Sequence, residues 1–350
     1  MKREIVIGKR RVGTGHPVYV IAELSANHGG NFQRAARTIR AMKAAGADAV
    51  KVQTYTADTL TIACDNKFFK IGGGTLWDGR TLHELYQEAS MPWDWQPKLQ
   101  KIARAIGLDF FSTPFDATAV DFLEKLKVPA HKIASFELVD IPLIKKIAST
   151  GKPIIASTGM ATVEEIREAL KAARGSGARQ IALLKCTSAY PAKPEEMNLR
   201  TLPDMAKRFG VPVGLSDHTM GIAASVAAVA LGACIVEKHF TLSRKFSGPD
   251  SAFSLEPDEF AEMVAAIRAA EKAMGRVNYR ISAGEKKSRK FRRSLFVVAD
   301  VKACEKFTEK NVRSIRPGNG LRTRHLAEVL GKKAARDVKR GTPLRWKDVR

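Results

Sequence analysis

The sequence has few cysteines and no long apolar run. Its 350 residues include four cysteines, at positions 64, 186, 234 and 304, and no CxxC pair. This spacing argues against a zinc ribbon or a disulfide framework and fits a reducing cytoplasm. The charged N-terminal stretch MKREIVIGKRR lacks the apolar core of a signal peptide. The least charged segment, Met220–Val236, is slightly short for a membrane span and is interrupted at Gly232, so it predicts a buried helix followed by a buried strand.

Acidic residues are scarce as well, because 36 Asp and Glu stand against 59 Lys and Arg, for a net charge of +23. The last 80 residues hold 24 basic and 8 acidic side chains, so +16 of the excess lies there. Such an excess attracts phosphates, nucleic acid or anionic surfaces, but it can equally reflect a basic proteome. A nucleic-acid-binding protein is the alternative from a different class. The chain has no interleaved aromatics, RNP-like pattern or helix-turn-helix signal to support it.

Short runs rich in Val, Ile and Phe alternate with amphipathic segments over the first 240 residues. Eight strand-like runs alternating with helices predict an α/β fold of the (β/α)8 TIM-barrel type. We place the barrel at residues 1–275, a basic linker at 276–293 and a small second domain at 294–350. The eight runs are Val18–Ala22, Ala49–Val52, Leu108–Phe111, His131–Ala134, Pro153–Ala156, Ile181–Leu184, Val213–Leu215 and Cys234–Val236.

Two histidines end the seventh and eighth runs, His218 and His239, each close to an acidic residue. In a barrel the strand ends converge on one face, which is where such enzymes keep their active sites. Imidazoles and carboxylates suit a divalent cation such as Mn²⁺. Asp217 and Glu237 are candidates to orient these ligands or to act as acid/base groups. The alternative for either histidine is a satisfied core side chain.

Lysines and hydroxyls at the other strand ends form a second group of candidate residues. Two ammonium groups with several hydroxyls describe a pocket for phosphate and carboxylate. The alternative for a barrel lysine is a salt bridge to Glu23 on a neighbouring strand, and both arrangements can hold in one site. The predicted ligand is a small phosphorylated acid beside a metal-bound carbonyl. The members of the group are Lys51, Lys132, Thr113, Ser135, Ser157 and Ser216.

The connection Tyr55–Met91 is long for a barrel. Long loops on the catalytic face often form lids or recognition elements. Its glycines do not form a GxxxxGK[ST] loop, and no GxGxxG follows a strand, so a nucleotide-binding fold is disfavoured.

Nine short motifs then resemble those of the sialic acid synthase family, in that family's order along nearly the whole chain. Within the family, WDGRTLHELYQEA, PWDW, SAYPA and DSAFSLEPDEF resemble the branch that makes pseudaminic acid more than the N-acetylneuraminate branch. The nine motifs are IAELSANHGG (Ile21–Gly30), KVQTYTADTLT (Lys51–Thr61), FFSTPFD (Phe110–Asp116), KIASFEL (Lys132–Leu138), STGMAT (Ser157–Thr162), LLKCTSAYPA (Leu183–Ala192), GLSDHT (Gly214–Thr219), EKHFTL (Glu237–Leu242) and RPGNGL (Arg316–Leu321).

The resemblance implies a TIM barrel followed by an antifreeze-like (SAF) domain, in a domain-swapped homodimer where that domain covers the partner's active site. It implies condensation of phosphoenolpyruvate (PEP) with the open-chain form of an N-acetylated amino sugar, with Mn²⁺ as the cofactor and Mg²⁺ or Co²⁺ as alternatives. The expected sugar is 2,4-diacetamido-2,4,6-trideoxy-L-altrose, and the expected location is the cytoplasm, without a membrane or nucleic-acid partner.

By motif position, the resemblance also implies a role for each candidate residue. His218 and His239 would hold the metal, and Glu23 would be the acid/base group. PEP would lie on Lys51, Thr113, Lys132, Ser135, Ser157 and Ser216, with Lys51, Lys132 and Glu237 completing the catalytic set. The sugar or the metal-bound water would face Gln53, Tyr190, Glu237 and Asp250, and Arg316 from the other subunit would reach the acetamido group.

Two alternatives remain beside this reading. The first is a synthase of N-acetylneuraminic or legionaminic acid, which uses a manno-configured acceptor. The second is a non-catalytic SAF binding module, which does not account for polar residues at all the strand ends.

Overall fold

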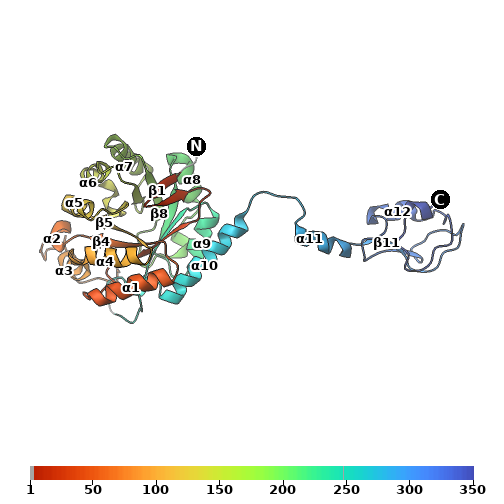
Figure 1. The fold of residues 1–350 in the computed structure, drawn as a ribbon, viewed down its shortest axis with the longest axis horizontal. Helices are drawn as coiled ribbons and strands as arrows, with labels where there is room; N and C mark the ends of the chain where they lie inside the picture. The colour runs from red at the N-terminus through yellow and green to blue at the C-terminus, as the bar shows by residue number, and fades with distance from the viewer. Residues whose placement is uncertain (1–3, 247) are drawn as a thin grey trace. The chain divides into compact units, whose positions relative to one another are not determined.

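Among the described residues, 4–246 and 248–350, eight parallel strands close into a barrel, as the alternation of apolar runs predicts (Figure 1). The structure is a computed structural model. Each strand pairs with the next along the chain, and the last returns to the first with Val236 opposite Val20. The strands are β3 (Tyr19–Glu23), β4 (Ala49–Thr54), β5 (Asp109–Pro114), β6 (His131–Ile133), β7 (Ile154–Ser157), β8 (Ile181–Cys186), β9 (Val213–Asp217) and β10 (Ile235–His239).

Helices surround the barrel and bury their apolar faces against the outward side chains of the strands. The core between strands and helices includes Val50 and Val236 together with Ile39 and Phe260. Several helices begin at a side-chain cap, such as Thr162, whose hydroxyl accepts from the backbone N–H of Glu165 at 3.2 Å. The helices are α1 (Phe32–Ala44), α4 (Trp95–Ala105), α5 (Ala117–Lys125), α6 (Ile141–Ala148), α7 (Val163–Gly175), α8 (Thr201–Phe209), α9 (Ala223–Ala230) and α10 (Pro257–Met274).

An N-terminal hairpin precedes the barrel, and the sequence analysis does not anticipate it. It consists of β1 (Glu4–Ile7) and β2 (Arg10–Gly13). Ile5, Ile7 and Val12 are fully buried in one cluster with barrel side chains. Four-residue strands in a charged stretch give too short a pattern to recognise, although alternate positions are apolar.

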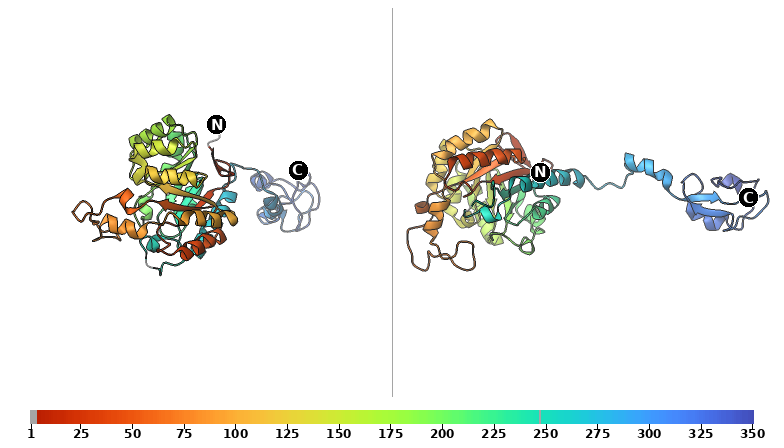
Figure 2. Two further views of the ribbon diagram at one scale, coloured as in Figure 1. Left: turned by 60° about the vertical axis from the view of Figure 1, so that its left-hand side comes forward. Right: turned by 90° about the horizontal axis from the view of Figure 1, so that it is seen from below.

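The Tyr55–Met91 connection stands out from the barrel in both views of Figure 2 and holds secondary structure of its own. It contains α2 (Ala57–Leu60) and α3 (Leu82–Ala89). A capping box between Thr81 and Glu84 stabilises the N-terminus of α3. Short 3-10 turns also follow the strands, at η1 (Phe136–Val139), η2 (Pro194–Glu196) and η3 (Ser251–Phe253).

The chain divides into two compact units, Met1–Gly275 and Arg276–Arg350. The second unit begins with α11 (Ala283–Ser288) and η4 (Arg289–Phe291), which lie within the basic stretch. Its own apolar core includes Leu295 and Phe307. Its remaining elements are β11 (Ser294–Val297), β12 (Val312–Ile315), η5 (Thr323–His325), α12 (Leu326–Val329) and η6 (Trp346–Asp348). No helix in the described part of either unit is long and apolar enough to cross a membrane.

Candidate active site

The ends of β9 and β10 place alternate side chains on opposite faces of the barrel wall. Ser216 donates to Glu237 at 3.2 Å inside the barrel, and the rings of His218 and His239 lie 5.3 Å apart. Asp217 instead forms a buried ion pair with Lys238 at 2.8 Å. Asp217 also accepts hydrogen bonds from Thr219 and Ser225, so its oxygens are engaged away from the histidines. The expectation that Asp217 serves the metal or the chemistry is therefore wrong.

Lys51 lies among acids and a hydroxyl at the end of β4. Its ammonium group forms an ion pair with Glu23 and lies 3.7 Å from Glu237 Oε1. It also donates to Thr113 Oγ1 at 3.2 Å. Burial alone would lower the pKa of Lys51, but Glu23 and Glu237 outweigh it and hold the pKa above its usual range. Lys51 is therefore charged, and the salt bridge to Glu23 expected as an alternative is present.

Lys132 lies on β6, two strands from Lys51 on β4, and shares Glu237 with it. Its ammonium donates to Ser157 Oγ at 2.6 Å and lies 3.5 Å from Glu237 Oε1. Burial lowers the pKa of Lys132, and the opposite effect of the Glu237 carboxylate only partly offsets this lowering. Burial would raise the pKa of Glu237, but Lys132 and Lys51 outweigh it and hold the carboxyl ionised. Two cations around one carboxylate can receive a further anion, because each keeps donors free.

Ser135 lies beside the same group, at the end of β6. Its hydroxyl accepts from the backbone N–H of Gly159 at 3.1 Å. A Cβ at position 159 would lie 2.7 Å from Ser135 Oγ and 2.2 Å from Ser188 Oγ, so only glycine fits here. The STGMAT motif thus keeps a glycine where a backbone approaches two hydroxyls closely.

Gln53 and Asp250 are brought together through Ser25. Gln53 Nε2 donates to Glu23 Oε1 at 3.1 Å and to Ser25 Oγ at 3.0 Å. The Ser25 hydroxyl in turn donates to Asp250, which also accepts from the backbone N–H of Ala26 at 3.3 Å. Burial raises the pKa of Asp250 and also that of Glu23. Carboxyls with raised pKa values are suited to hold or release protons near neutral pH.

Aromatic rings wall the histidine side of the site. Tyr190 lies 4.5 Å from the ring of His218, and Phe253 lies 5.0 Å from the ring of His239. Trp77, from the Tyr55–Met91 connection, packs 5.9 Å from Tyr190, and its indole N–H donates to Pro249 O at 3.1 Å. The long connection therefore contributes to the wall of the site, which agrees with a recognition role.

The histidine pair meets the requirements of a cation site. His218 Nδ1 lies 3.0 Å from Thr187 O, to which it can donate when it carries the proton. In that tautomer the lone pair of Nε2 is available to bind a cation. Burial, and next the neighbouring His218, hold the pKa of His239 well below its usual range, so this ring is neutral. Burial would lower the pKa of His218 too, but Cys186 and the Thr187 carbonyl outweigh it and raise that pKa, so His218 has to release a proton before Nε2 can bind a cation. His239 Nδ1 and Glu237 Oε2 are buried without a hydrogen-bond partner among the described residues. Asp250 Oδ2 lies 4.0 Å from His239 Nδ1.

Those residues fit a divalent cation held by few protein ligands. No group of three or more His, Cys, Asp or Glu in the described part of the chain is arranged to hold a metal. Two imidazoles leave coordination positions for water and substrate, as a Lewis-acid site needs.

Sequence reasoning missed Glu137, which follows Ser135 in the KIASFEL motif. Its Oε2 is buried without a hydrogen-bond partner among the described residues. Burial raises the pKa of Glu137 to about 7. Burial, and next the Glu137 carboxyl, raise the pKa of Tyr86 on α3. An acidic residue two positions after a candidate binding serine was the available signal. Its burial depends on the Tyr55–Met91 connection, whose path through space the sequence does not predict.

Arg316 is the one candidate outside the barrel unit. It directly follows β12 in the second unit and is exposed. The other thirteen candidates lie at the barrel mouth: Glu23, Lys51, Gln53, Thr113, Lys132, Ser135, Ser157, Tyr190, Ser216, His218, Glu237, His239 and Asp250. Their individual roles stay predictions.

Comparison with protein-family models gives two matches. The NeuB family model matches residues 38–279, and the SAF domain model matches residues 292–350. Together they cover most of the chain and agree with a barrel followed by a SAF domain.

Relatives of similar length are synthases of nonulosonic acids. The chain is 45% identical to a pseudaminic acid synthase of Campylobacter jejuni, over 96% of this chain and 98% of that protein. It is 44% identical to the pseudaminic acid synthase of Helicobacter pylori, over 95% and 98%. It is 34% identical to the N,N'-diacetyllegionaminic acid synthase of Legionella pneumophila, over 96% of both.

Solved structures place the fold in the same group. The N-acetylneuraminic acid synthetase of Leptospira borgpetersenii, solved in complex with citrate, gives a TM-score of 0.73 at 31% identity, over 82% of this chain and 95% of that one. The spore coat polysaccharide biosynthesis protein SpsE of Bacillus subtilis gives a TM-score of 0.68 at 34% identity, over 99% of both chains.

Proposed function

The chain belongs to the NeuB family, and from this premise we propose that it makes pseudaminic acid from PEP and open-chain 2,4-diacetamido-2,4,6-trideoxy-L-altrose. The observation that carries the branch is the 45% identity to pseudaminic acid synthase, against 34% and 39% for two legionaminic acid synthases. The observation that supports the reaction is the pair of lysines around Glu237, beside two histidines.

In this proposal the lysine side of the mouth binds PEP. Lys51 and Lys132 neutralise its carboxylate and phosphate, and hydroxyls of Thr113, Ser157 and Ser216 complete the hydrogen bonds. Because these donors are buried, their interaction with an anion is stronger than at the surface. The lysines also fix the enol carbon of PEP toward the centre of the barrel.

The acceptor sugar lies on the histidine side, between Gln53, Tyr190 and Asp250. His218 and His239 would hold a divalent cation, Mn²⁺ in our proposal, which supplies Lewis-acid polarisation of the aldehyde when bound. The open-chain acceptor then presents its aldehyde carbon to C3 of PEP.

The bond changes balance without a further reactant except water. C3 of PEP bonds to the aldehyde carbon, and the aldehyde oxygen takes a proton. Glu23 is placed to move that proton, because burial raises its pKa and Gln53 and Lys51 orient it. The positive charge that develops at C2 is stabilised by the neighbouring carboxylates. Water then bonds to C2 and returns one proton to Glu23. The bond between C2 and the bridging oxygen breaks, the added hydroxyl becomes the C2 carbonyl as its second proton passes to the phosphate, and inorganic phosphate leaves.

The proposed assembly is a domain-swapped homodimer in which Arg316 of the partner subunit contacts the acetamido group. Mixing Arg316→Ala with His239→Ala protein tests it. If the two residues come from different subunits, half of the dimers regain one intact site, and activity recovers to about a quarter of wild type. No recovery after subunit exchange contradicts the assembly.

We place the reaction in the cytoplasm, where PEP is made.

A phosphate-release assay tests the function itself. PEP is incubated with the altro acceptor, its manno analogue or N-acetylmannosamine, and the product is identified by NMR. Release with the altro sugar alone supports the proposal, whereas preference for a manno acceptor favours an N-acetylneuraminate or legionaminate synthase. PEP labelled at the bridging oxygen should transfer its label to phosphate, and label retained in the sugar acid contradicts C–O cleavage.

A further inference from the structure

A hollow on the outer wall of the barrel, between α7 and α8, is lined by four cationic side chains. Its volume is about 340 Å³, and its lining residues are Arg167, Leu170, Lys171, Arg174, Arg208 and Phe209. None of them is acidic. Leu170 and Phe209 are buried and form the apolar floor where the two helices pack. The hollow lies outside the strands, so it is separate from the barrel mouth.

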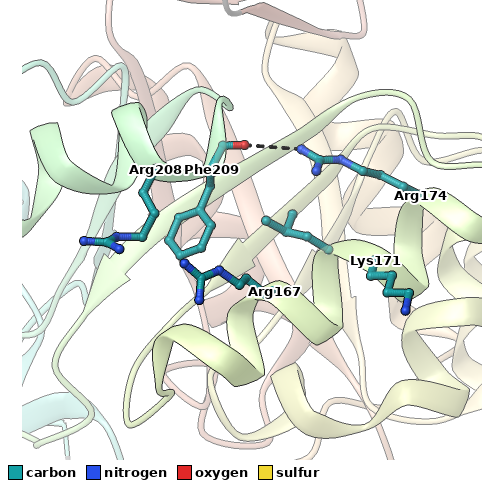
Figure 3. Close-up of a pocket in the computed structure, with 6 residues that line it drawn as sticks. Arg167, Lys171, Arg174, Arg208 and Phe209 are labelled. Carbon is teal, nitrogen blue, oxygen red and sulfur yellow. Dashed lines mark hydrogen bonds between the residues drawn. The ribbon is translucent and has the colours of Figure 1, made fainter.

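The side chains around the hollow are partly fixed in place. Arg174 donates to the backbone carbonyl of Phe209 at 3.3 Å, and Arg167 lies beside the Phe209 ring (Figure 3). Arg208 holds Asp204 through Nε and Nη2, at 2.8 and 3.1 Å. These contacts order the guanidinium groups and leave other N–H donors of each group free.

The positive charge of the hollow exceeds what its carboxylate neighbours neutralise. Arg208 pairs with Asp204, and Arg167 pairs with Glu164 at 3.3 Å. Lys171 makes no hydrogen bond or ion pair among the described residues. Like charges around the hollow repel one another, although solvent screens this repulsion because the side chains of Arg167 and Arg208 are 56% and 40% exposed, and a bound anion would relieve it. Guanidinium groups match phosphate oxygens in geometry, so phosphate is the anion that this lining suits.

We propose that the hollow between α7 and α8 is a binding site for a small phosphate-bearing anion, a mono- or diphosphate, with Arg167, Lys171, Arg174 and Arg208 as its ligands. The volume lies at the lower end of the range for small-molecule sites, which suits a small ligand. The alternative is a solvated basic surface near the C-terminal ends of two helices, where cations are favourable without any ligand.

Titration calorimetry with inorganic pyrophosphate tests the proposal on the full chain. Because the barrel mouth also attracts phosphates, the wild type should bind two equivalents. The double variant R167Q/K171Q should lose one of them, with Kd raised by at least about tenfold at that site. Lys132→Gln should weaken the other equivalent only. The matched control, Lys207→Gln, changes an exposed lysine of α8 that does not line the hollow, and it should retain both.

Thermal unfolding of each variant checks that it is folded. If the double variant does not fold, the titration is repeated with Lys171→Gln alone. A single equivalent that only Lys132→Gln removes would overturn the proposal. So would binding that R167Q/K171Q and Lys207→Gln weaken equally, because that is the behaviour of a diffuse basic surface.

Discussion

Asn27 ties the loop that carries Asp250 to the end of the barrel. Its side-chain amide donates to Phe240 O at 3.0 Å and to Ser254 Oγ at 2.8 Å, and its carbonyl accepts from Ser251 Oγ at 3.1 Å. Ser254 Oγ in turn donates to Asp250 O at 2.6 Å. Asn27 is therefore placed to hold the loop of Asp250, whose Oδ2 lies 4.0 Å from His239 Nδ1, and we expect it to act as a positioning residue.

Asn27→Asp removes both donated hydrogen bonds at nearly constant size. It places a buried carboxylate beside the Phe240 carbonyl, and the lost bonds to buried acceptors cost about 1–3 kcal/mol each. The free energy of unfolding should fall by roughly 2–5 kcal/mol. The loop should also loosen, because Ser254 loses its amide donor.

The kinetic consequence separates a positioning role from a purely structural one. Under the proposed function, the KM for the acceptor sugar should rise by about tenfold, a loss of roughly 1.4 kcal/mol of binding. The KM for PEP should change little, because Lys51 and Lys132 hydrogen-bond to Thr113 and Ser157 and, among the described residues, not to Asn27. Mn²⁺ binding, followed by electron paramagnetic resonance, should weaken as well.

The assay is steady-state phosphate release with each substrate varied in turn. Asn198→Asp is the matched control, since it introduces the same charge at an exposed position. Refutation would come from an equal rise of both KM values, or from lower stability with unchanged kinetics and Mn²⁺ binding.

Three further predictions concern residues with other partners. His239→Ala should abolish Mn²⁺ binding by the folded protein, as circular dichroism and paramagnetic resonance would show, and retained binding would contradict the metal assignment. Burial lowers the pKa of His28 to about 4 in the folded protein, against about 6.5 in the unfolded chain. The neutral ring therefore stabilises the fold fully above pH 6.5. The free energy of unfolding should fall by up to about 3 kcal/mol as the pH is lowered from 6.5 toward 4. His28→Gln should flatten this slope in denaturant unfolding, and an unchanged slope would exclude His28 as its source. Lys238→Met should destabilise the protein by about 3–5 kcal/mol, because it leaves the buried Asp217 carboxylate without its ion-pair partner. An unchanged unfolding midpoint would argue against that ion pair as a stabilising contact.

The barrel could be predicted because its signal repeats. Eight apolar runs that alternate with helical segments specify both the strand count and their order, and sequential strands pair in all such barrels. The N-terminal hairpin could not be predicted, because two strands of four residues in a charged stretch give no repeat. Arg316 is a candidate only through the resemblance of RPGNGL to the family motif, because no pattern in the sequence relates a residue of the second unit to the barrel mouth, and its role stays a prediction.

Glu137 escaped prediction because its environment is tertiary. Its carboxyl lies near Tyr86, on α3, about fifty residues earlier in the chain, and burial there raises its pKa to about 7. The sequence places α3 in a long connection whose path depends on contacts such as that of Trp77 with Tyr190. Motif position alone therefore identifies the residue type but not its unusual protonation.

Asp217 and Glu237 looked alike in the sequence, and strand geometry separates them. Side chains alternate between the two faces of a strand, so Glu237 shares a face with His239, two positions on, whereas Asp217 and His218 are neighbours on opposite faces. The structure follows this rule: Glu237 meets both lysines inside the barrel, and Asp217 pairs with Lys238 in the wall. Glu237 lies between two ammonium groups, of which Lys51 also pairs with Glu23, whereas Asp217 is neutralised by Lys238. The anion site that we propose therefore depends on which of the two acids faces inward.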